Sequence, residues 1–180
     1  MRKLFLIAGH GGKDSGAVSG SYIERDLAIE LRFLVNNELR KLNIIPNMDA
    51  NQNYLSQTLS WLKGKFTAKD VIIDIHWNAS SNPTANGTEV IIPEMFSQYE
   101  RSFAEALAST IASIGFKNRG VKPETDTARK KLAIMRPSAE NILIEVCFIS
   151  NAQDMLLYQR SKQLLAKKLA YIIREHLNKP

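Results

Sequence analysis

The chain of 180 residues lacks the features that define several specialised protein classes. It has a single cysteine, Cys147, so no disulfide can form within the chain, which excludes a disulfide-stabilised scaffold. Nine glycines and six prolines are too few for a collagen-like or low-complexity chain. No apolar run approaches the roughly 20 residues that cross a bilayer. The remaining composition, 44% apolar and 23% charged, is typical of a globular protein, and the length predicts one domain over residues 1–180.

The charge is basic but dispersed along the chain. Lys and Arg number 24 against 18 Asp and Glu, which gives a net charge of +6. An anionic partner, whether nucleic acid, a cell-wall polymer or a membrane surface, would explain this excess, and so would surface charge that favours solubility. The densest cluster, Arg129-Lys130-Lys131, is short and has no interleaved aromatic residues, so we expect no nucleic-acid partner. No heptad pattern is present, and we expect a monomer without stable membrane insertion.

Residues 1–9 resemble the start of an export signal, with basic residues followed by an apolar run. Met1-Arg2-Lys3 precedes an apolar run of six residues, 4–9. That run is shorter than the roughly 7–15 residues of a signal-peptide core, and no cleavage-site pattern follows it. We therefore expect the run to be the first strand of the fold and the chain to carry no export signal. Removal of a signal from a longer precursor would leave the same pattern.

Short apolar runs alternate with amphipathic stretches. Apolar residues recur at helical spacing on one face of four stretches, which are 24–42, 54–66, 97–114 and 152–177. Runs rich in β-branched and other apolar residues predict strands at 3–8, 43–46, 71–75, 88–92, 132–135 and 141–146, and residues 116–131 predict a long loop. Strands that alternate with helices predict an α/β sandwich around a mostly parallel sheet.

Three polar residues stand at or near the ends of predicted strands. His10 lies in a Gly-His-Gly-Gly loop, His76 follows residues 71–75, and Glu145 interrupts the apolar run 141–146. Ligand sites of open α/β sheets lie beyond the carboxyl ends of strands, so parallel strands would bring these residues together. Each also has a purely structural interpretation: a turn histidine, a histidine at the rim of the core, and a glutamate in a buried ion pair.

Three other residues favour structural roles on sequence alone. Ser21-Tyr22-Ile23-Glu24 matches a capping box in which Glu24 bonds back to the backbone, although Glu24 also starts a helix near the His10 loop. Cys147 is typical of a small buried hydrophobic residue. His176, near the end of the last helix, is expected to be solvated.

Two histidines and one carboxylate form the ligand set of a catalytic zinc site with a fourth position open to water. The carboxylate of Glu145 would then take a proton from that water, as in metal-assisted amide hydrolysis. Asp74 would fix the ring of His76 only if the strand bends. The wide spacing of these residues matches no compact motif, so the residues alone leave a zinc hydrolase and a structural interpretation equally open.

Four motifs in register resemble the zinc-dependent N-acetylmuramoyl-L-alanine amidases of the amidase-3 type over nearly the whole chain. The motifs are Ile7-Ala8-Gly9-His10-Gly11-Gly12-Lys13-Asp14-Ser15-Gly16-Ala17, Ile75-His76-Trp77-Asn78-Ala79, Asn118-Arg119-Gly120-Val121-Lys122 and Ile144-Glu145-Val146-Cys147-Phe148-Ile149-Ser150-Asn151. The resemblance implies one Zn²⁺ per chain, with the metal ligands His10, Glu24 and His76. It implies a catalytic role for Glu145 and substrate contacts for Asn78 and Arg119. It also implies a three-layer α/β sandwich whose mixed, mostly parallel sheet has about six strands.

The reaction that the resemblance implies is hydrolysis of the amide between the lactyl group of N-acetylmuramic acid and L-alanine of the peptidoglycan stem peptide. A single catalytic domain without wall-binding repeats resembles a phage endolysin, which reaches the wall when the membrane opens. A cellular remodelling amidase whose export signal has been removed, acting in the periplasm or outside the cell, is the alternative role. A zinc carboxypeptidase, with Arg119 on a terminal carboxylate, and a non-catalytic wall-binding module stay open as other functions.

The sequence departs from the family pattern at three places. Asn47-Met48 stand where Thr-Arg is frequent, Thr58 stands near a usual helix arginine, and Cys147 replaces a usual glycine. None of these changes removes a ligand, so they concern packing and substrate fit. The gap from His76 to Glu145 is too short to hold the regulatory helix of some members, which predicts an open site.

Overall fold

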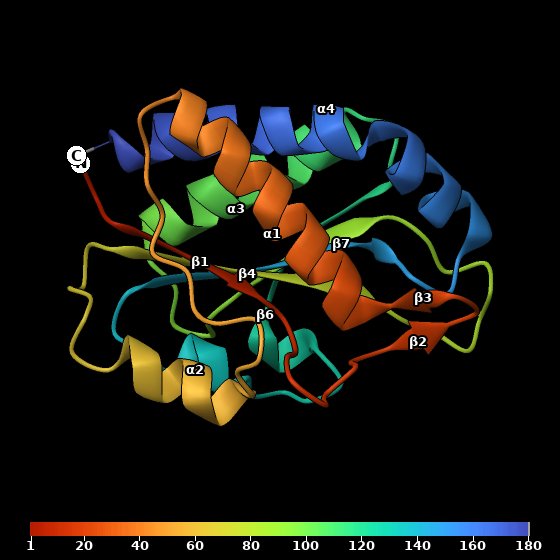
Figure 1. Cartoon of the computed structure of the whole chain (residues 1–180), viewed down its shortest axis with the longest axis horizontal. Coiled ribbons are helices and arrows are strands. Elements are labelled where there is room, and N and C mark those ends of the chain that lie inside the picture. Colours follow the sequence, from red (N-terminus) through yellow and green to blue (C-terminus); the bar gives the residue numbers. More distant parts are fainter. Residues whose placement is uncertain (180) are drawn as a thin grey trace.

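The computed structural model describes residues 1–179, which form two sheets and four α-helices (Figure 1). The larger sheet has five strands in the order β1-β4-β7-β5-β6, and β2 pairs with β3 in the smaller one. The strands are β1 (Leu4–Ala8), β2 (Val18–Ser19), β3 (Tyr22–Ile23), β4 (Val71–Asn78), β5 (Thr88–Ile92), β6 (Asn118–Pro123) and β7 (Glu140–Phe148). The helices are α1 (Glu24–Lys41), α2 (Leu55–Leu62), α3 (Gln98–Ala112) and α4 (Ala152–Leu177), with 3₁₀ turns η1 (Glu124–Asp126) and η2 (Ala133–Met135).

The larger sheet is mixed and mostly parallel. β1 and β7 flank β4 in parallel, β5 runs antiparallel to β7, and β6 is parallel to β5. Helices α1, α3 and α4 cover one face, and α2 lies on the other (Figure 1). The three-layer α/β architecture is therefore confirmed, with five strands in the described part of the larger sheet instead of about six.

Two of the expected strands are not strands. Residues 43–46 lead only to an isolated bridge between Phe5 and Asn47, because Pro46 has no amide hydrogen with which to extend the pairing. Residues 132–135 contain η2, where Ile134 and Met135 are buried in the smaller apolar cluster without strand pairing. An apolar tetrapeptide can bury its side chains in either form, so the pattern does not distinguish them.

β6 lies where the sequence predicts a loop. Its residues, Asn118–Pro123, contain one aliphatic side chain, a glycine and a proline. The strand forms the edge of the larger sheet and pairs only with β5. Edge strands tolerate polar residues and proline because one of their sides faces solvent, and such a strand leaves little signal in the sequence.

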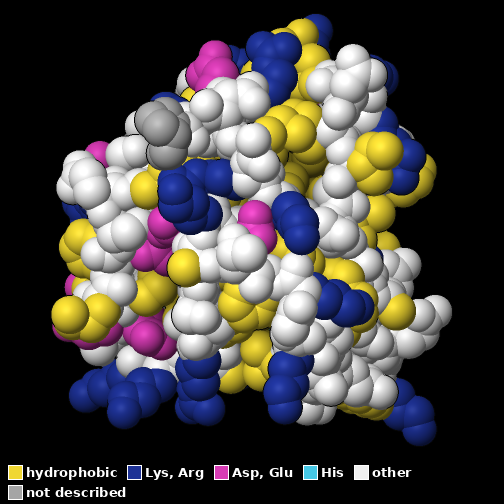
Figure 2. Space-filling view, turned by 90° about the vertical axis from the view of Figure 1, so that its left-hand side faces the viewer, with side chains coloured by type: hydrophobic (Ala, Val, Ile, Leu, Met, Phe, Trp, Pro, Cys, Tyr) yellow, Lys and Arg dark blue, Asp and Glu magenta, His cyan; other side chains and the backbone are white. Residues whose placement is uncertain are grey.

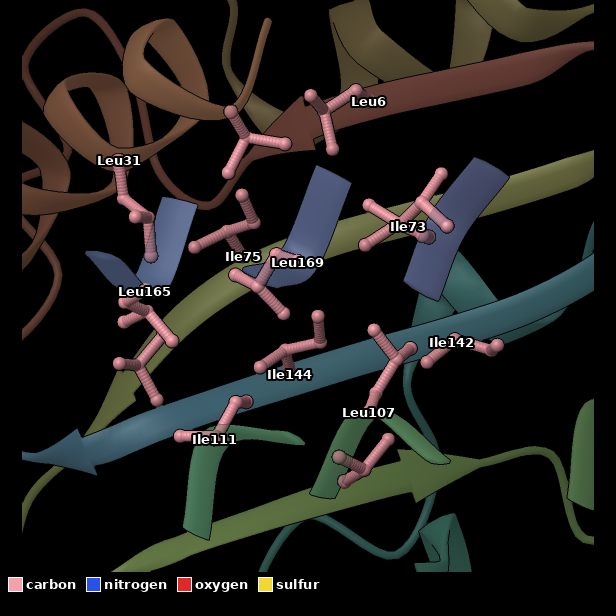
Figure 3. Packing of buried hydrophobic residues seen from close by; sticks show 14 of the residues in the cluster. Leu6, Leu31, Ile73, Ile75, Leu107, Ile111, Ile142, Ile144, Leu165 and Leu169 are labelled. Atoms are coloured by element: carbon pink, nitrogen blue, oxygen red, sulfur yellow. The ribbon is translucent and has the colours of Figure 1, made fainter. Parts of the chain in front are cut away.

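The main hydrophobic core lies between the sheet and helices α1, α3 and α4. Ile73, Ile75, Ile142 and Ile144 alternate along β4 and β7 and are almost fully buried. Burial of such a side chain stabilises a fold by about 1.5–3 kcal/mol. Figure 3 shows these isoleucines beneath the aliphatic side chains of three helices: Leu31, Leu107, Ile111, Leu165 and Leu169.

The opposite face of the sheet is covered over only part of its length. The smaller apolar cluster there contains Phe5, Ile72 and Leu143 and packs under α2 and η2. Towards the carboxyl ends of β1, β4 and β7, the same face carries polar side chains that line a cleft of about 930 Å³. This unequal cover of the two faces leaves room for a site.

The two ends of the described chain lie together near the amino ends of the parallel strands (Figure 1). The backbone amide of Arg2 donates to the Leu177 carbonyl at 3.2 Å. On this side of the molecule, lysine and arginine side chains form several separate groups and no continuous stripe (Figure 2). Within residues 1–179, no helix has the length and apolar character needed to span a membrane.

His176 is buried, so the expectation that it is solvated is wrong. Its ring stacks on Phe103 with 4.3 Å between the ring centroids. Its Nδ1–H donates to the Ile172 carbonyl at 3.0 Å, and its Nε2 accepts from Lys179 Nζ at 2.7 Å. Burial lowers the pKa of His176 below its ordinary value of 6.5, so the neutral ring is the native form.

We predict that His176→Gln flattens the dependence of stability on pH below neutrality. As the pH falls through 6.5, the unfolded state binds a proton on His176 that the folded state resists, so the wild type loses stability. The glutamine variant lacks this titration. Urea denaturation at about pH 7.5 and about pH 5.5 should therefore show a smaller loss of unfolding free energy in the variant. Equal losses in the two proteins would contradict a buried neutral ring.

Candidate metal centre and active-site cleft

The site is built on one row of residues across the sheet. His76 of β4 pairs with Glu145 of β7, and Glu145 pairs with Glu89 of β5. Residues directly opposite each other on neighbouring strands point to the same face, which here is the face of α2. The sheet thus brings His76 and Glu145 together, as strand ends in parallel register should.

His10 reaches this row from the loop after β1. Its backbone has a φ of 66°, a left-handed conformation that is uncommon for a residue with a side chain. Gly9 packs directly on the ring of His76, since a Cβ at position 9 would lie 2.3 Å from His76 Cε1. Glycine at this position therefore lets the loop lie against the end of β4. The rings of His10 and His76 have their centroids 5.0 Å apart.

Glu24 is the first residue of α1, and the capping-box interpretation of residues 21–24 is wrong. The N-cap of the helix is Ile23, which makes no side-chain capping hydrogen bond. The carboxylate of Glu24 is buried and accepts from the backbone amides of Ala17 at 2.8 Å and Trp77 at 3.1 Å. These two amides hold one carboxylate oxygen each and fix the orientation of the group.

His10, Glu24 and His76 form one compact cluster. The Nε2 of His10 lies 3.2 Å from Glu24 Oε2, and the Nδ1 of His76 lies 2.8 Å from Glu24 Oε1. One possible ligand atom from each residue lies within 4.8 Å of the others. Two imidazole nitrogens and a carboxylate oxygen are a donor set that suits a divalent transition metal. The cluster can therefore hold one metal ion.

A carboxylate stands behind each histidine. Asp14 Oδ2 lies 2.9 Å from His10 Nδ1, and Asp74 Oδ2 lies 3.1 Å from His76 Nε2. If each ring donates its hydrogen to that carboxylate, the nitrogen that faces Glu24 keeps its lone pair for a metal. Asp74 and His76 are two residues apart on β4 and share a face, so their contact needs no bend of the strand, contrary to the expectation from sequence.

The cluster is strongly coupled in charge. Burial opposes ionisation of Glu24, but its hydrogen bonds with His10 and His76 outweigh burial and hold the pKa of Glu24 well below its ordinary value. Burial also opposes protonation of the histidines, yet the carboxylate of Glu24 raises the pKa of His10, and that of Asp74 raises the pKa of His76. The site thus favours positive charge, and a metal that binds there must displace protons from the rings.

Glu145 lies beside the cluster without belonging to it. Its Oε2 is buried and has no hydrogen-bond partner among residues 1–179. Burial raises the pKa of Glu145 to about 7. No ion pair to a lysine or arginine is found for it in the described chain, so the interpretation of Glu145 as half of a buried ion pair is wrong. A carboxylate with this pKa and a free oxygen in a cleft is suited to accept and return a proton.

Asn78 and Arg119 meet at Glu89, a buried residue that the sequence analysis did not single out. Asn78 Nδ2 donates to Glu89 Oε1 at 2.8 Å, and Arg119 Nε donates to Glu89 Oε2 at 2.7 Å. Lys122 Nζ donates to the same Oε2 at 2.7 Å. A glutamate inside the apolar run 88–92 is the same signal that identified Glu145, and it was available in the sequence.

A bulge in β6 explains how Arg119 and Lys122 share one partner. The pairing register between β5 and β6 shifts at this point, and β6 places both Arg119 and Gly120 opposite Glu89. Gly120 adopts a φ of 86°, which glycine tolerates without steric cost. Residues three apart on a regular strand point to opposite faces, so the additional residue returns Lys122 to the face of Arg119.

The structure shows what surrounds two of the departures from the family pattern, Thr58 and Cys147. Thr58 lines the cleft from α2 and donates its hydroxyl hydrogen to the buried carboxylate of Asp49. Arg32 of α1 pairs with the same carboxylate at 2.5 Å. Cys147 is fully buried in the main core, and burial raises the pKa of its thiol, which confirms a packing residue.

All six residues singled out as site residues line the one cleft of about 930 Å³: His10, Glu24, His76, Asn78, Arg119 and Glu145. A family model described as N-acetylmuramoyl-L-alanine amidase matches residues 4–175, a span that contains all of them. The chain belongs to this family, Amidase_3. The resemblance seen in the sequence motifs is therefore confirmed.

Individual proteins of known name match most of the chain. The N-acetylmuramoyl-L-alanine amidase LytC of Bacillus subtilis is 27% identical over 84% of this chain, and the endolysin of Bacillus phage SPP1 is 27% identical over 99%. The chain spans 30% of the length of LytC and 67% of the endolysin. The catalytic domain of CwlV, an N-acetylmuramoyl-L-alanine amidase from Bacillus (Paenibacillus) polymyxa, shares the fold, with a TM-score of 0.82 at 24% identity over 99% of both chains.

We predict that Gly16→Ala disrupts the metal cluster and that Gly20→Ala does not. Both glycines have a positive φ, 62° and 57°. Alanine should therefore cost each site about 1–2 kcal/mol of backbone strain. A Cβ at position 16 would lie 2.5 Å from Glu24 Oε2 and His10 Cδ2, whereas a Cβ at position 20 meets nothing within 4 Å. Metal content per chain, measured by elemental analysis, should fall at least about 10-fold in Gly16→Ala alone. Equal metal content in the two variants would contradict the assigned cluster.

We predict that Asp74→Asn weakens metal binding while the fold is retained. Asparagine keeps the size of the side chain but removes the charge that orients His76, an effect of about 10- to 100-fold in metal affinity. Competition with a chelator measures the affinity, and thermal denaturation checks the fold. Asp14→Asn, behind the other histidine, is the companion variant. An unchanged affinity in Asp74→Asn would show that this carboxylate does not support His76 as a ligand.

Proposed function

We propose that this Amidase_3 chain is a zinc-dependent peptidoglycan hydrolase. In this proposal it cleaves the amide between the lactyl group of N-acetylmuramic acid and L-alanine of the stem peptide. The observation that carries the proposal is the pairing of Glu145 with His76, which sets an unpartnered carboxylate oxygen beside a three-residue metal cluster. Membership of the family and the activity in the name of LytC support the same reaction.

One zinc ion per chain fits the residues of the cluster. His10 and His76 offer nitrogen, Glu24 offers oxygen, and three protein ligands are typical of catalytic zinc. The carboxylates of Asp14 and Asp74 fix the two rings from behind. When bound, zinc supplies Lewis-acid chemistry: it polarises a carbonyl oxygen and eases the deprotonation of water.

Glu145 carries the proton in this reaction. Its carboxylate accepts a proton from the water that attacks the lactyl carbonyl carbon. It then gives a proton to the nitrogen of L-alanine as the carbon–nitrogen bond breaks. The products are a lactyl carboxylate on the glycan and a stem peptide with a free amino terminus. The Oε2 of Glu145, which has no hydrogen-bond partner among residues 1–179, is free to carry the proton in both halves of the transfer.

Asn78 and Arg119 contact the substrate on the side of the cleft that β5 and β6 form. Both residues line the cleft, and Glu89 orients both side chains. In a carboxypeptidase, Arg119 would hold the terminal carboxylate of the substrate, which would have to compete with Glu89 for the guanidinium. The pairing of Arg119 with Glu89 therefore favours the amidase over the carboxypeptidase.

The biological role in this proposal is lysis or remodelling of the cell wall, with peptidoglycan as the partner. The likeness to the SPP1 endolysin supports a phage lysin that meets the wall once the membrane opens. The likeness to LytC supports a cellular amidase that acts outside the cytoplasm. The cluster and Glu145 come from one chain, so a monomer is sufficient for the chemistry.

We predict that Glu145→Gln lowers turnover by about 10²- to 10⁴-fold and leaves metal binding intact, because glutamine cannot accept the proton. The assay digests purified peptidoglycan and identifies the released fragments by mass spectrometry. The wild type should release stem peptides with a free amino-terminal alanine. A chelator should block this release, and added zinc should restore it.

His10→Ala is the control variant, and it should lose both metal and activity. Loss of metal in Glu145→Gln would make Glu145 a ligand instead of the proton carrier. Shortened stem peptides that remain attached to glycan would identify a carboxypeptidase. Wall binding without any product by the zinc-loaded wild type would identify a binding module.

A further inference from the structure

The charges that line the cleft are segregated. Four of the six carboxylates of the described lining lie at or beside the metal cluster, whereas every lysine and arginine of that lining belongs to residues 119–136. We call these five residues the cationic wall: Arg119, Lys122, Arg129, Lys131 and Arg136. The wall follows the edge strand β6 and the segment that runs from it through η1 and η2.

The cationic wall carries more positive charge than its acidic neighbours offset. Glu89 pairs with both Arg119 and Lys122, at 2.7 Å from each. The remaining three cations are exposed and form no ion pair within residues 1–179; they are Arg129, Lys131 and Arg136. Asp126 is the one acidic residue that lines the cleft from the same segment. An excess of one sign along a cleft concentrates the electric field there and attracts an anionic ligand.

The sheet sets the distance from Glu145 to the cationic wall. Glu145 on β7 is opposite Glu89 on β5, and Glu89 in turn pairs with Arg119 on β6. Neighbouring strands lie about 4.8 Å apart, so β6 is roughly 10 Å from β7. An extended peptide advances roughly 3.3–3.6 Å per residue. Arg119 reaches back to Glu89 on β5, one strand spacing from β7, so the wall begins between roughly 4.8 and 10 Å from Glu145. That interval corresponds to the second to fourth residue of a peptide whose first residue lies at Glu145.

The substrate under the proposed function carries its acidic groups on one side of the scissile amide. The lactyl carboxyl group is consumed in that amide, and the sugar rings are neutral. The stem peptide keeps free carboxylates, on the glutamate that follows L-alanine and at its carboxyl end. Charge complementarity therefore distinguishes the peptide from the glycan.

We propose that the cationic wall binds the α-carboxylate of the glutamate in the stem peptide and so directs the peptide, rather than the glycan, along β6. This inference rests on the proposed function and adds a specificity to it. A stem peptide whose glutamate keeps its α-carboxylate is the preferred substrate, and one whose α-carboxylate is amidated is the poorer one. Exposed charge pairs of this kind act mainly on binding and are weakened by salt.

The test compares two soluble muramoyl peptides that differ only at this group, a free carboxylate in one and a carboxamide in the other. Lys130 offers a matched control, because it lies between Arg129 and Lys131, is exposed as they are, and is not among the residues that line the cleft. The variants are the double substitution Arg129→Gln/Lys131→Gln, the single substitution Arg136→Gln, and the control Lys130→Gln. All are assayed as the zinc-loaded full chain.

The wild type should hydrolyse the carboxylate substrate with the higher kcat/KM, and added salt should reduce the difference. The double variant should lose roughly 5- to 10-fold in kcat/KM on that substrate, through KM, and little on the carboxamide. Arg136→Gln should act in the same direction, and Lys130→Gln should match the wild type on both substrates. Equal losses on the two substrates, or a loss in Lys130→Gln as large as in the double variant, would overturn the proposal.

Failure of the proposed function has a different signature. If the zinc-loaded wild type hydrolyses neither substrate, the amidase assignment fails. Calorimetric titration with the free stem peptides then still tests the wall, which should bind the carboxylate form more tightly than the carboxamide. Equal binding of the two peptides overturns the inference. Inhibition by poly(glycerol phosphate) that depends on Arg129 and Lys131, without discrimination between the peptides, overturns it as well and assigns the wall to a phosphate polymer.

Discussion

The register of three neighbouring strands, β4, β7 and β5, is the constraint on which the rest of the structure depends. Side chains alternate between the faces of a sheet, so a slip of one residue in β7 would turn Glu145 into the core beneath the helices and turn a neighbouring apolar residue into the cleft. The buried isoleucines of β4 and β7 prevent that slip, since each would have to leave the core. The hydrophobic layer under α1, α3 and α4 thus positions the polar residues on the opposite face. Packing and chemistry are two consequences of one alternating pattern.

The same arrangement concentrates negative charge. Four carboxylates surround the two histidines of the cluster: Asp14, Glu24, Asp74 and Glu145. A buried carboxylate destabilises a fold unless donors or cations offset its desolvation. Backbone amides do so for Glu24, and the histidines do so in part for Asp74. The Oε2 of Glu145 has no hydrogen-bond partner among residues 1–179 that would do so. The cluster therefore adds little to the stability of the chain by itself, as expected if it binds a cation and moves a proton under the proposed function.

The sequence predicted those parts of the molecule that depend on periodicity. Four helices and the buried strands follow from apolar spacing, and the placement of His10, His76 and Glu145 follows from the ends of those strands. The role of Glu24 was ambiguous, because the sequence allowed either a local capping box or a long-range contact. The hydrogen bonds from Ala17 in the first loop and Trp77 in β4, which form only in the folded chain, show that the second is correct. The edge strand β6 is mostly polar and the turn η2 has only three residues, so neither leaves an apolar period in the sequence. The stacking of His176 on Phe103 joins two helices distant in sequence, and no local pattern reports it. The full ligand set came from the resemblance to the family, since wide spacing carries no signal of its own.

The position of the two chain ends has a mechanical consequence. Both ends of the described chain lie at the amino ends of the parallel strands, and the cleft opens beyond their carboxyl ends. A tether joined to either end would leave the molecule on the side opposite the cleft. It would pull on β1 and α4 together and would not cross the mouth of the cleft. The substrate under the proposed function, peptidoglycan, is an insoluble mesh that does not diffuse to an enzyme, so the enzyme must be brought to it. A molecule that is anchored at its chain ends can move its cleft across such a mesh without detaching.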